Sequence, residues 1–251
     1  MTGPGTLILV RHGQSTSNAD GRFTGWADVP LTPRGEKQAA EAGRQISEHE
    51  LLPDVVHTSV LRRSVRSAEI LLEEVDRAWI PVQRTWRLNE RQYGALTGRD
   101  KREVRQEAGP EQYQAWRRSL TEAPGPLPAD RLAELRADPR YAGLDGTALP
   151  AVESLAGMVA RVAPYWADVL AGQLLTGRTV LVVAHGNSLR ALVAVLDRLT
   201  EHEVEDLNIP TGAPLRYDFD HDLHPVVRGG GYLDPISARS AAADVAAEGH
   251  A

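Results

Sequence analysis

The 251-residue sequence contains no cysteine, which excludes disulfide bonds, thiolate metal ligands and cysteine nucleophiles. It also lacks long hydrophobic runs, and no stretch approaches the roughly 18 apolar residues that a membrane helix requires. The short apolar run near the N-terminus has no basic segment before it, so it does not resemble a secretory signal. Repeats of solenoid length and interdomain linkers are absent too. We therefore expect a single cytoplasmic domain spanning residues 1–251 that has no contact with a membrane.

The charge of the chain argues against a polyanionic partner. The net charge is −6, whereas nucleic-acid-binding domains are usually basic, so we expect no nucleic-acid partner. The window from residue 84 to residue 118 is an exception, because it holds nine basic and five acidic residues. Such a local positive field suits a small anion, although the window by itself is also typical of a solvated helix face with mixed charges.

Alternating apolar and helical patterns indicate the fold class. Apolar runs predict strands at 6–10, 54–59 and 179–186, and periodic patterns predict helices at 31–49, 61–75 and 188–199. The helix at 31–49 has Thr32 as its N-cap and Pro33 in its first turn. Strands that alternate with helices of this length predict an α/β fold with a largely parallel sheet.

Two segments depart from this rhythm. Residues 121–154 contain five prolines, too many for a continuous helix or a central strand, which predicts a long irregular excursion, either a lid or a disordered segment. The Ala-rich segment 236–251 predicts a weakly helical, flexible tail.

Two histidines occur in matching contexts. The stretches "LVRHGQS" (9–15) and "VVAHGNS" (182–188) both read as an apolar strand followed by histidine, glycine, an amide and serine. Ligands of open parallel sheets bind at the carboxyl ends of the strands, and the amides at a helix start can hold an anion. Either histidine alone would more often be structural, but the pair, with Arg11 beside His12, indicates a functional site.

These residues suit phosphoryl transfer. A neutral imidazole can attack phosphorus and carry the phosphoryl group covalently. The loose transition state spreads charge over the equatorial oxygens and needs fixed cations, for which Arg11 and Arg63 are candidates. The reaction also needs a carboxylic acid to exchange a proton with the substrate hydroxyl, and Glu90 is the candidate. Glu90 could instead form a surface ion pair, because Arg87 and Arg91 flank it.

Motifs in the same order along nearly the whole chain carry a family resemblance: "LVRHGQS", "FTGWADVPLTPRGEKQA", "TSVLRRSVRSA", "WRLNERQYGALTG", "AHGNSLRALV" and "LNIPTG". The chain resembles the histidine phosphatase superfamily and, within it, the cofactor-dependent phosphoglycerate mutases. The resemblance implies a three-layer α/β/α sandwich with a mostly parallel central sheet. It also implies an isomerase that interconverts 2-phosphoglycerate and 3-phosphoglycerate in glycolysis and gluconeogenesis.

The same resemblance assigns roles to particular residues. His12 would be the phosphorylated nucleophile and Glu90 the general acid and base, while His185, Arg63 and Arg11 would stabilise the transferring phosphoryl group. The substrate-binding residues it implies are Gly13, Gln14, Ser15, Asn18, Thr24, Gly25, Arg91, Gln92, Tyr93, Lys101, Arg117, Arg118, Gly186 and Asn187. The positive window would then bind a triply charged phosphoglycerate.

The resemblance extends to the cofactor and the partners. The family's enzymes are primed by 2,3-bisphosphoglycerate, which leaves one phosphoryl group on the nucleophilic histidine, and they need no metal. The expected partner is a small anionic phosphorylated substrate. A homo-oligomer, dimer or tetramer, is compatible with the resemblance, and the sequence does not choose between these states.

The sequence departs from the family pattern at three places. Ser17 stands where tryptophan is usual, Gln92 where histidine is usual, and Gln14 where glutamate is commoner. The first two changes leave open a divergent mutase acting on another phosphorylated acid. Ser15 occupies the place where bisphosphoglycerate-synthesising relatives tend to have glycine, which argues against synthase as the main activity.

Two other functions remain as alternatives. One is a phosphatase that uses the same phosphohistidine and lets water replace the acceptor. The other is a regulatory module that binds phosphate without turnover. Lys101, Arg117 and Arg118 favour the mutase over the phosphatase, and the complete set of catalytic residues argues against the module.

Overall fold

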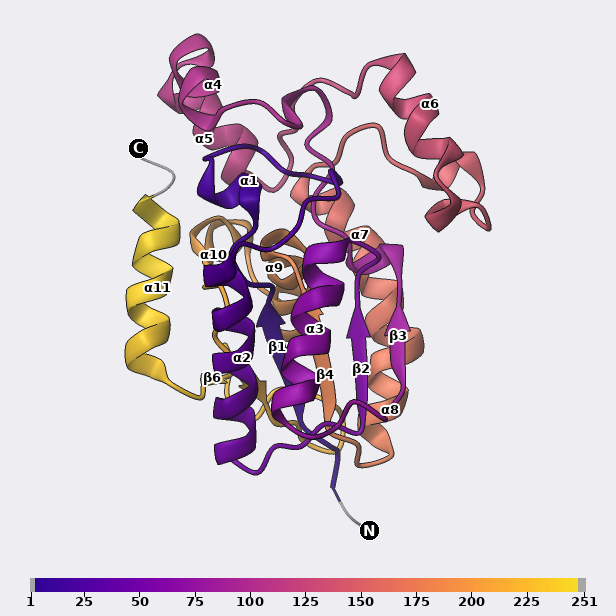
Figure 1. Ribbon diagram of the computed structural model, residues 1–251, viewed down its shortest axis with the longest axis vertical. Helices are drawn as coiled ribbons and strands as arrows, with labels where there is room; N and C mark the ends of the chain where they lie inside the picture. The colour runs from indigo at the N-terminus through magenta and orange to yellow at the C-terminus, as the bar shows by residue number, and fades with distance from the viewer. Residues whose placement is uncertain (1–2, 248–251) are drawn as a thin grey trace.

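A six-stranded sheet forms the centre of the computed structural model, which describes residues 3–247 (Figure 1). The strands lie in the order β3-β2-β4-β1-β5-β6. Their bounds are β1 Leu7–Arg11, β2 Val55–Thr58, β3 Val82–Arg84, β4 Val180–Ala184, β5 Leu215–Tyr217 and β6 Gly231–Tyr232. The first four pair in parallel, whereas β5 and β6 are antiparallel. The three predicted strands and the mostly parallel sheet are confirmed.

Helices cover both faces of the sheet (Figure 1). Their bounds are α1 Thr16–Ala19, α2 Pro33–Glu48, α3 Arg62–Glu74, α4 Lys101–Ala108, α5 Pro110–Arg118, α6 Ala129–Ala137, α7 Leu155–Tyr165, α8 Ala171–Leu175, α9 Gly186–Asp197, α10 Glu201–Asp206 and α11 Pro235–Ala247. The α2 and α3 helices lie on one face, and α7 and α9 lie on the other. The three-layer α/β/α sandwich is confirmed. None of these described helices is long and apolar enough to cross a membrane.

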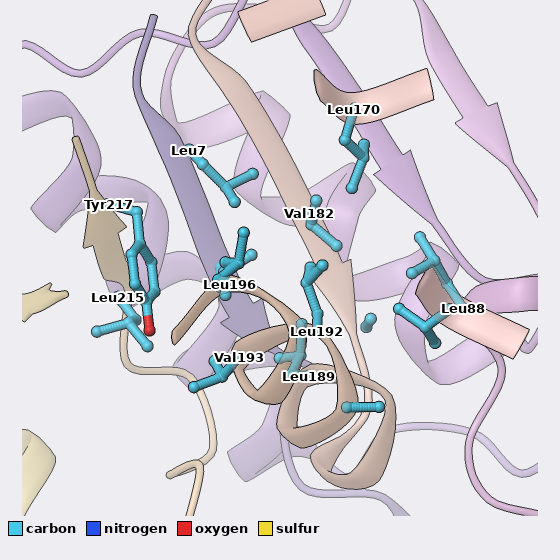
Figure 2. Close-up of a cluster of buried hydrophobic side chains, with 14 of the residues drawn as sticks. Leu7, Leu88, Leu170, Val182, Leu189, Leu192, Val193, Leu196, Leu215 and Tyr217 are labelled. Atoms are coloured by element: carbon cyan, nitrogen blue, oxygen red, sulfur yellow. The ribbon is translucent and has the colours of Figure 1, made fainter. Parts of the chain in front are cut away.

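The alternation of side chains along each strand divides the core between the two faces. Leu7 and Leu9 of β1 pack in the cluster under α7 and α9, whereas Ile8 and Val10 pack in the cluster under α2 and α3. Figure 2 shows leucines of α9 pointing toward Leu7 of β1 and toward β4. Because both faces are covered, β1 and β4 are almost entirely apolar, and this is why their runs were visible in the sequence.

The helix starts follow the local sequence. Thr32 caps α2 by accepting a hydrogen bond from the Gly35 amide, and Pro33 stands in the first turn, as predicted. The α9 helix begins at Gly186, directly after β4, with His185 as its N-cap. In the sheet Arg11 pairs with Ala184, so the residues that follow β1 and β4 emerge together at one edge.

The two atypical segments contain more helix than expected. Residues 121–154 include the α6 helix and two 3-10 turns, Pro139–Tyr141 and Gly146–Ala148, so the prediction of an irregular excursion was wrong for these parts. Prolines lie at or before the start of two of these elements, where they are tolerated. The α4, α5 and α6 helices lie beyond the carboxyl ends of the strands (Figure 1). Residues 235–247 form α11, and 248–251 of the predicted tail lie outside the described residues.

Candidate active site

His12 and His185 face each other at the carboxyl edge of the sheet. Their ring centroids lie 4.9 Å apart, and both side chains are buried. His12 Nδ1 lies 2.7 Å from the carbonyl oxygen of Gly13, so this nitrogen carries the proton and donates it. Arg63 Nε lies 3.3 Å from His12 Nε2 and donates to it. Nε2 is therefore the ring nitrogen that holds a lone pair.

The surroundings of both histidines keep them neutral. Burial lowers the pKa of His12 well below its usual value, and the charges of Arg63 and Arg11 lower it further. Burial and the same arginines lower the pKa of His185 as well. Burial lowers the pKa of Arg63 to about 10, which still leaves its guanidinium charged at neutral pH. His12 is thus an unprotonated nucleophile beside fixed positive charge.

Ser59 holds the ring of His185, and sequence reasoning missed it. Ser59 Oγ lies 2.8 Å from His185 Nε2 and accepts a hydrogen bond from the Leu61 amide at 3.1 Å. If the Ser59 hydroxyl donates its proton to His185 Nε2, the imidazole proton lies on Nδ1. The signal was present in the sequence, since Ser59 directly follows β2 and reaches the same sheet edge as the two histidines.

The two predicted arginines are held rigidly by backbone carbonyls. Arg63 donates to the carbonyls of Ala27 at 2.8 Å and Gly25 at 2.9 Å. Arg11 donates to the carbonyl of Ile209 at 3.0 Å. Its guanidinium lies against Gly186, where a Cβ would come within 3.5 Å of the Arg11 Cζ atom. The guanidinium groups are therefore fixed in place before any anion binds.

Glu90 is anchored to the start of α9. Its Oε1 accepts hydrogen bonds from the Arg91 amide at 2.8 Å, the Asn187 amide at 3.2 Å and Asn187 Nδ2 at 3.0 Å. The side chain is buried, and the guanidinium groups of the flanking arginines donate to backbone carbonyls instead of to the Glu90 carboxylate. The alternative of a surface ion pair is therefore wrong. Asn187 follows His185 by two residues, so these hydrogen bonds connect Glu90 to the segment that carries His185.

Arg11 and Glu90 line a pocket, whereas the buried His12, Arg63 and His185 are not among its lining residues. Eleven of the predicted residues line it: Arg11, Asn18, Thr24, Gly25, Glu90, Tyr93, Lys101, Arg117, Arg118, Gly186 and Asn187. The residues that sequence reasoning missed are Arg22, Phe23, Arg190, Asn208 and Ile209. Among the described lining residues six are arginine or lysine and one is a carboxylate. This wall suits a small ligand with several negative charges.

Three buried N–H groups of arginines that line the pocket have no partner within residues 3–247: Arg11 Nε, Arg117 Nη1 and Arg190 Nε. The buried Nδ1 atom of His185 has no partner among these residues either. Burial lowers the pKa of Arg190 to about 9, with a further contribution from Arg118, and burial lowers the pKa of Arg118 too. Buried donors without acceptors are costly, and anionic oxygens in the pocket would satisfy them. Arg190 was detectable, since it follows the second histidine within "HGNSLRALV".

Five predicted binding residues do not line this pocket, and three of them lie on the segment after His12. The Gly13 amide donates to Ser67 Oγ, and a Cβ at Gly13 would overlap the Gly35 backbone, so this glycine allows α2 to approach. Gln14 Oε1 accepts a hydrogen bond from Thr32 Oγ1. Ser15 is buried and caps α1. These three residues shape the loop that carries the nucleophile.

The other two lie beyond Glu90. Arg91 is buried and donates to the backbone carbonyls of Glu153, Trp116 and Glu122. Gln92 Oε1 accepts from the Gly94 amide and from Thr97 Oγ1, and its side chain lines a separate cavity next to α6. Neighbours along a loop point in different directions, so being next to a site residue in the sequence did not place these side chains in the pocket.

Some residues of the positive window at 84–118 line the pocket, and others form a solvated helix face. Lys101, Arg117 and Arg118 line the pocket. Arg99 forms an exposed ion pair with Glu107 at 2.6 Å, as expected of a solvated helix face. Arg118 also donates to Asn208 Oδ1 at 2.7 Å, which ties the end of α5 to the "NIPTG" segment.

Comparisons with known proteins agree with this geometry. A model of the histidine phosphatase superfamily (branch 1) matches residues 7–142 and 129–229. The chain belongs to the histidine phosphatase superfamily, as its motifs indicated. It is 53% identical over 249 residues to a Mycobacterium tuberculosis H37Rv protein, covering 99% of each chain. That relative is named 2,3-bisphosphoglycerate-dependent phosphoglycerate mutase, as is one from Rhodococcus jostii RHA1 that is 51% identical, covering 98% of this chain and 97% of the relative.

Solved structures support the fold. A mycobacterial glucosyl-3-phosphoglycerate phosphatase bound to VO3 superimposes with a TM-score of 0.70 at 24% identity, covering 90% of this chain and 100% of that one. A putative alpha-ribazole-5'-P phosphatase from Escherichia coli K-12 gives a TM-score of 0.68 at 25% identity, covering 91% of this chain and 96% of the other.

Proposed function

We propose that this protein is a 2,3-bisphosphoglycerate-dependent phosphoglycerate mutase that interconverts 2-phosphoglycerate and 3-phosphoglycerate in glycolysis and gluconeogenesis. The observation that carries the proposal is the neutral His12, whose Nε2 lone pair lies beside Arg63, while Arg11 and Glu90 of the same site line a pocket with six cationic side chains. Relatives with this name match the chain over nearly its whole length.

The residues divide the reaction between them. His12 Nε2 attacks phosphorus while the bond from phosphorus to the substrate oxygen breaks. The Glu90 carboxyl gives its proton to the departing oxygen and takes a proton from the incoming hydroxyl in the reverse transfer. Arg11, Arg63 and the Nδ1–H of His185 donate to the equatorial oxygens as negative charge shifts between donor and acceptor.

The pocket fits a bisphosphorylated acid. Arg117 Nη1 and Arg190 Nε have no hydrogen-bond partner among the described residues, and both arginines line the pocket. A second anionic group of the substrate would accept hydrogen bonds from them. When bound, 2,3-bisphosphoglycerate supplies the phosphoryl group that His12 carries. The reaction as proposed needs no metal ion, since the arginines provide the positive charge and the neutral His185 can act as a hydrogen-bond donor. A cytoplasmic location, a single domain and a homo-oligomeric state, dimer or tetramer, remain predictions.

One assay separates the proposed activity from its alternatives. The protein is incubated with 3-phosphoglycerate, with and without 2,3-bisphosphoglycerate, and 2-phosphoglycerate and free phosphate are measured separately. A mutase forms 2-phosphoglycerate in a reaction that the bisphosphate stimulates, whereas a phosphatase releases phosphate. No turnover of either kind would favour a phosphate-binding module, and turnover of another phosphorylated acid alone would identify a divergent mutase.

Covalent labelling tests the nucleophile independently. Incubation with 2,3-bisphosphoglycerate labelled in its phosphates is expected to leave an acid-labile phosphoryl group on the wild-type protein and none on His12→Ala. Acid-labile label at wild-type stoichiometry in His12→Ala would overturn the assignment of His12.

A further inference from the structure

Glu90 lies on a segment that has little regular structure of its own. The segment runs between two 3-10 turns, Trp86–Leu88 and Gly94–Leu96. Its buried backbone carbonyls need donors that a helix or sheet would otherwise supply. A general acid must also stay within hydrogen-bond reach of the reacting oxygen. Some other part of the molecule must therefore hold this segment in place.

Arg161 of α7 supplies those donors. Its Nη1 donates to the carbonyl oxygens of Trp86 at 3.1 Å, Arg87 at 2.7 Å and Asn89 at 3.2 Å, and its Nη2 donates to that of Glu90 at 3.3 Å. One guanidinium group thus contacts four carbonyls in five successive residues. Arg161 is buried. The Arg161 guanidinium thus supplies the hydrogen-bond donors that these backbone carbonyls would otherwise find in a helix or sheet.

Glu153 completes the arrangement on the other side of Glu90. Its carboxylate accepts from Arg161 Nε at 2.7 Å and Nη2 at 2.9 Å, and Oε2 also accepts from the Gln92 amide at 2.9 Å. The Trp26 ring lies 5.7 Å from the Arg161 guanidinium carbon, and its Nε1 donates to the Glu90 carbonyl. The buried ion pair therefore holds the backbone on both sides of the acid.

We propose that Arg161 and Glu153 are positioning residues, which hold the Glu90 carboxyl where it can exchange a proton with the substrate oxygen. The inference rests on the proposed role of Glu90. Neither side chain lines the substrate pocket, and their hydrogen bonds act on Glu90 through the backbone of its segment. A displacement of about 1 Å at a reacting group can cost on the order of 100-fold in rate.

The test uses two conservative variants and two phosphoryl donors. Arg161→Lys keeps the positive charge but loses the planar fork that reaches several carbonyls, and Glu153→Gln keeps the shape but loses the charge. Steady-state kinetics measures the interconversion of phosphoglycerates. Rapid-quench labelling measures transfer to His12 from p-nitrophenyl phosphate, whose leaving group departs as a stable anion and needs no proton from Glu90.

The expected result is selective for proton transfer. Arg161→Lys lowers kcat with phosphoglycerate by about 10- to 100-fold with KM within about threefold, and leaves labelling from p-nitrophenyl phosphate within about threefold. Glu153→Gln shows the same selectivity with a smaller loss, because glutamine still accepts from the Gln92 amide. Combining Arg161→Lys with Glu90→Gln gives little further loss, because the positioned group is already missing.

Val162→Ala is the matched control. It changes the next residue of α7, which is buried in the core under that helix, so it lowers the urea midpoint without disturbing the carbonyl contacts. Equal losses with both donors in Arg161→Lys, or a Val162→Ala protein with the same selective loss, would overturn the positioning role. So would full additivity with Glu90→Gln.

A failure of the proposed function has a different signature. In that case the wild-type protein does not interconvert phosphoglycerates. The leaving-group comparison is then made on phosphoryl transfer from glycerol 3-phosphate and p-nitrophenyl phosphate to His12, where a selective loss with the alkyl ester still supports the positioning role and an equal loss overturns it.

Discussion

Lowering the pH should destabilise this protein through histidines that the fold keeps neutral. Burial lowers the pKa of His12, His185 and His57 below the ordinary value of 6.5, and for His12 and His185 the arginines of the site add to this effect. His57 lies in β2, away from the pocket, with Nδ1 2.6 Å from Tyr165 Oη and Nε2 2.7 Å from Gln173 Oε1. His57 therefore contributes to the pH dependence of stability but takes no part in the proposed phosphoryl transfer.

The sign follows from proton counting. Below about pH 6.5 the unfolded chain protonates these histidines, whereas the folded chain does not, so the unfolded state binds more protons and unfolding becomes easier as the pH falls. For a histidine that stays neutral in the folded state, lowering the pH from 7.5 to 5 reduces the free energy of unfolding by about 2 kcal/mol. His12 and His185 together cost about 4 kcal/mol, and His57 adds up to about 2 kcal/mol. The free energy of unfolding of a typical domain is about 5–15 kcal/mol, so this loss is a large part of it.

Urea unfolding at a series of pH values measures this loss, with the slope m monitored to confirm a common transition. The variant His57→Gln keeps hydrogen-bonding capacity but cannot titrate, so its pH-dependent loss should be smaller than that of the wild type by up to about 2 kcal/mol. Its mutase kcat should be unchanged at neutral pH. A free energy of unfolding that is flat from pH 7.5 to 5 in the wild type would refute the reasoning.

Three further predictions concern the site. Glu90→Gln should slow phosphoryl exchange with phosphoglycerate by about 10² to 10⁴-fold with the fold intact, and a near-wild-type rate in quenched-flow assays would show that another group moves the proton. Ser59→Ala leaves His185 Nε2 without its partner, so urea unfolding should show a loss of about 1–3 kcal/mol and kcat should fall; unchanged values would contradict its role. Ser17 is not among the residues that line the pocket and Gln92 lines a different cavity, so Ser17→Trp and Gln92→His should leave the ratio of mutase to phosphatase activity unchanged; a rise of about tenfold in the ratio of the two products would contradict this.

The sequence predicted the parts of the fold that bury apolar residues on a regular period. The β1 and β4 strands are apolar on both faces and β2 begins with two buried valines, so their runs stood out, and the meeting of His12 and His185 followed from the shared edge of parallel strands. The β3, β5 and β6 strands have three residues or fewer, too short for a period to show. The helix in the proline-rich excursion was missed because prolines at or before a helix start were counted as breakers.

The sequence predicted which residue types form the site better than it predicted which side chains point into the pocket. Glu90 was identified by its chemistry and lies in the pocket, whereas Arg91 and Gln92, next to it in the sequence, contact other parts of the molecule. Arg161 was missed because its contacts with the backbone around Glu90 form only when α7 packs against that segment, whereas Ser59 could have been found from its place directly after β2. Such positions become visible once the strands and helices are placed.

The positive charges of the pocket perform two tasks that usually conflict. A phosphoryl-transfer site needs cations to hold the anion, and a histidine nucleophile needs to stay unprotonated. Here Arg63 donates directly to His12 Nε2, so the same guanidinium that would bind a phosphoryl oxygen also disfavours a proton on that nitrogen. When the anion enters, its charge offsets the repulsion among the arginines, and ligand binding then stabilises the folded state by mass action. The clustered cations thus destabilise the empty protein and stabilise the complex with the anion. The site is therefore arranged for phosphoryl transfer and not for the stability of the empty protein.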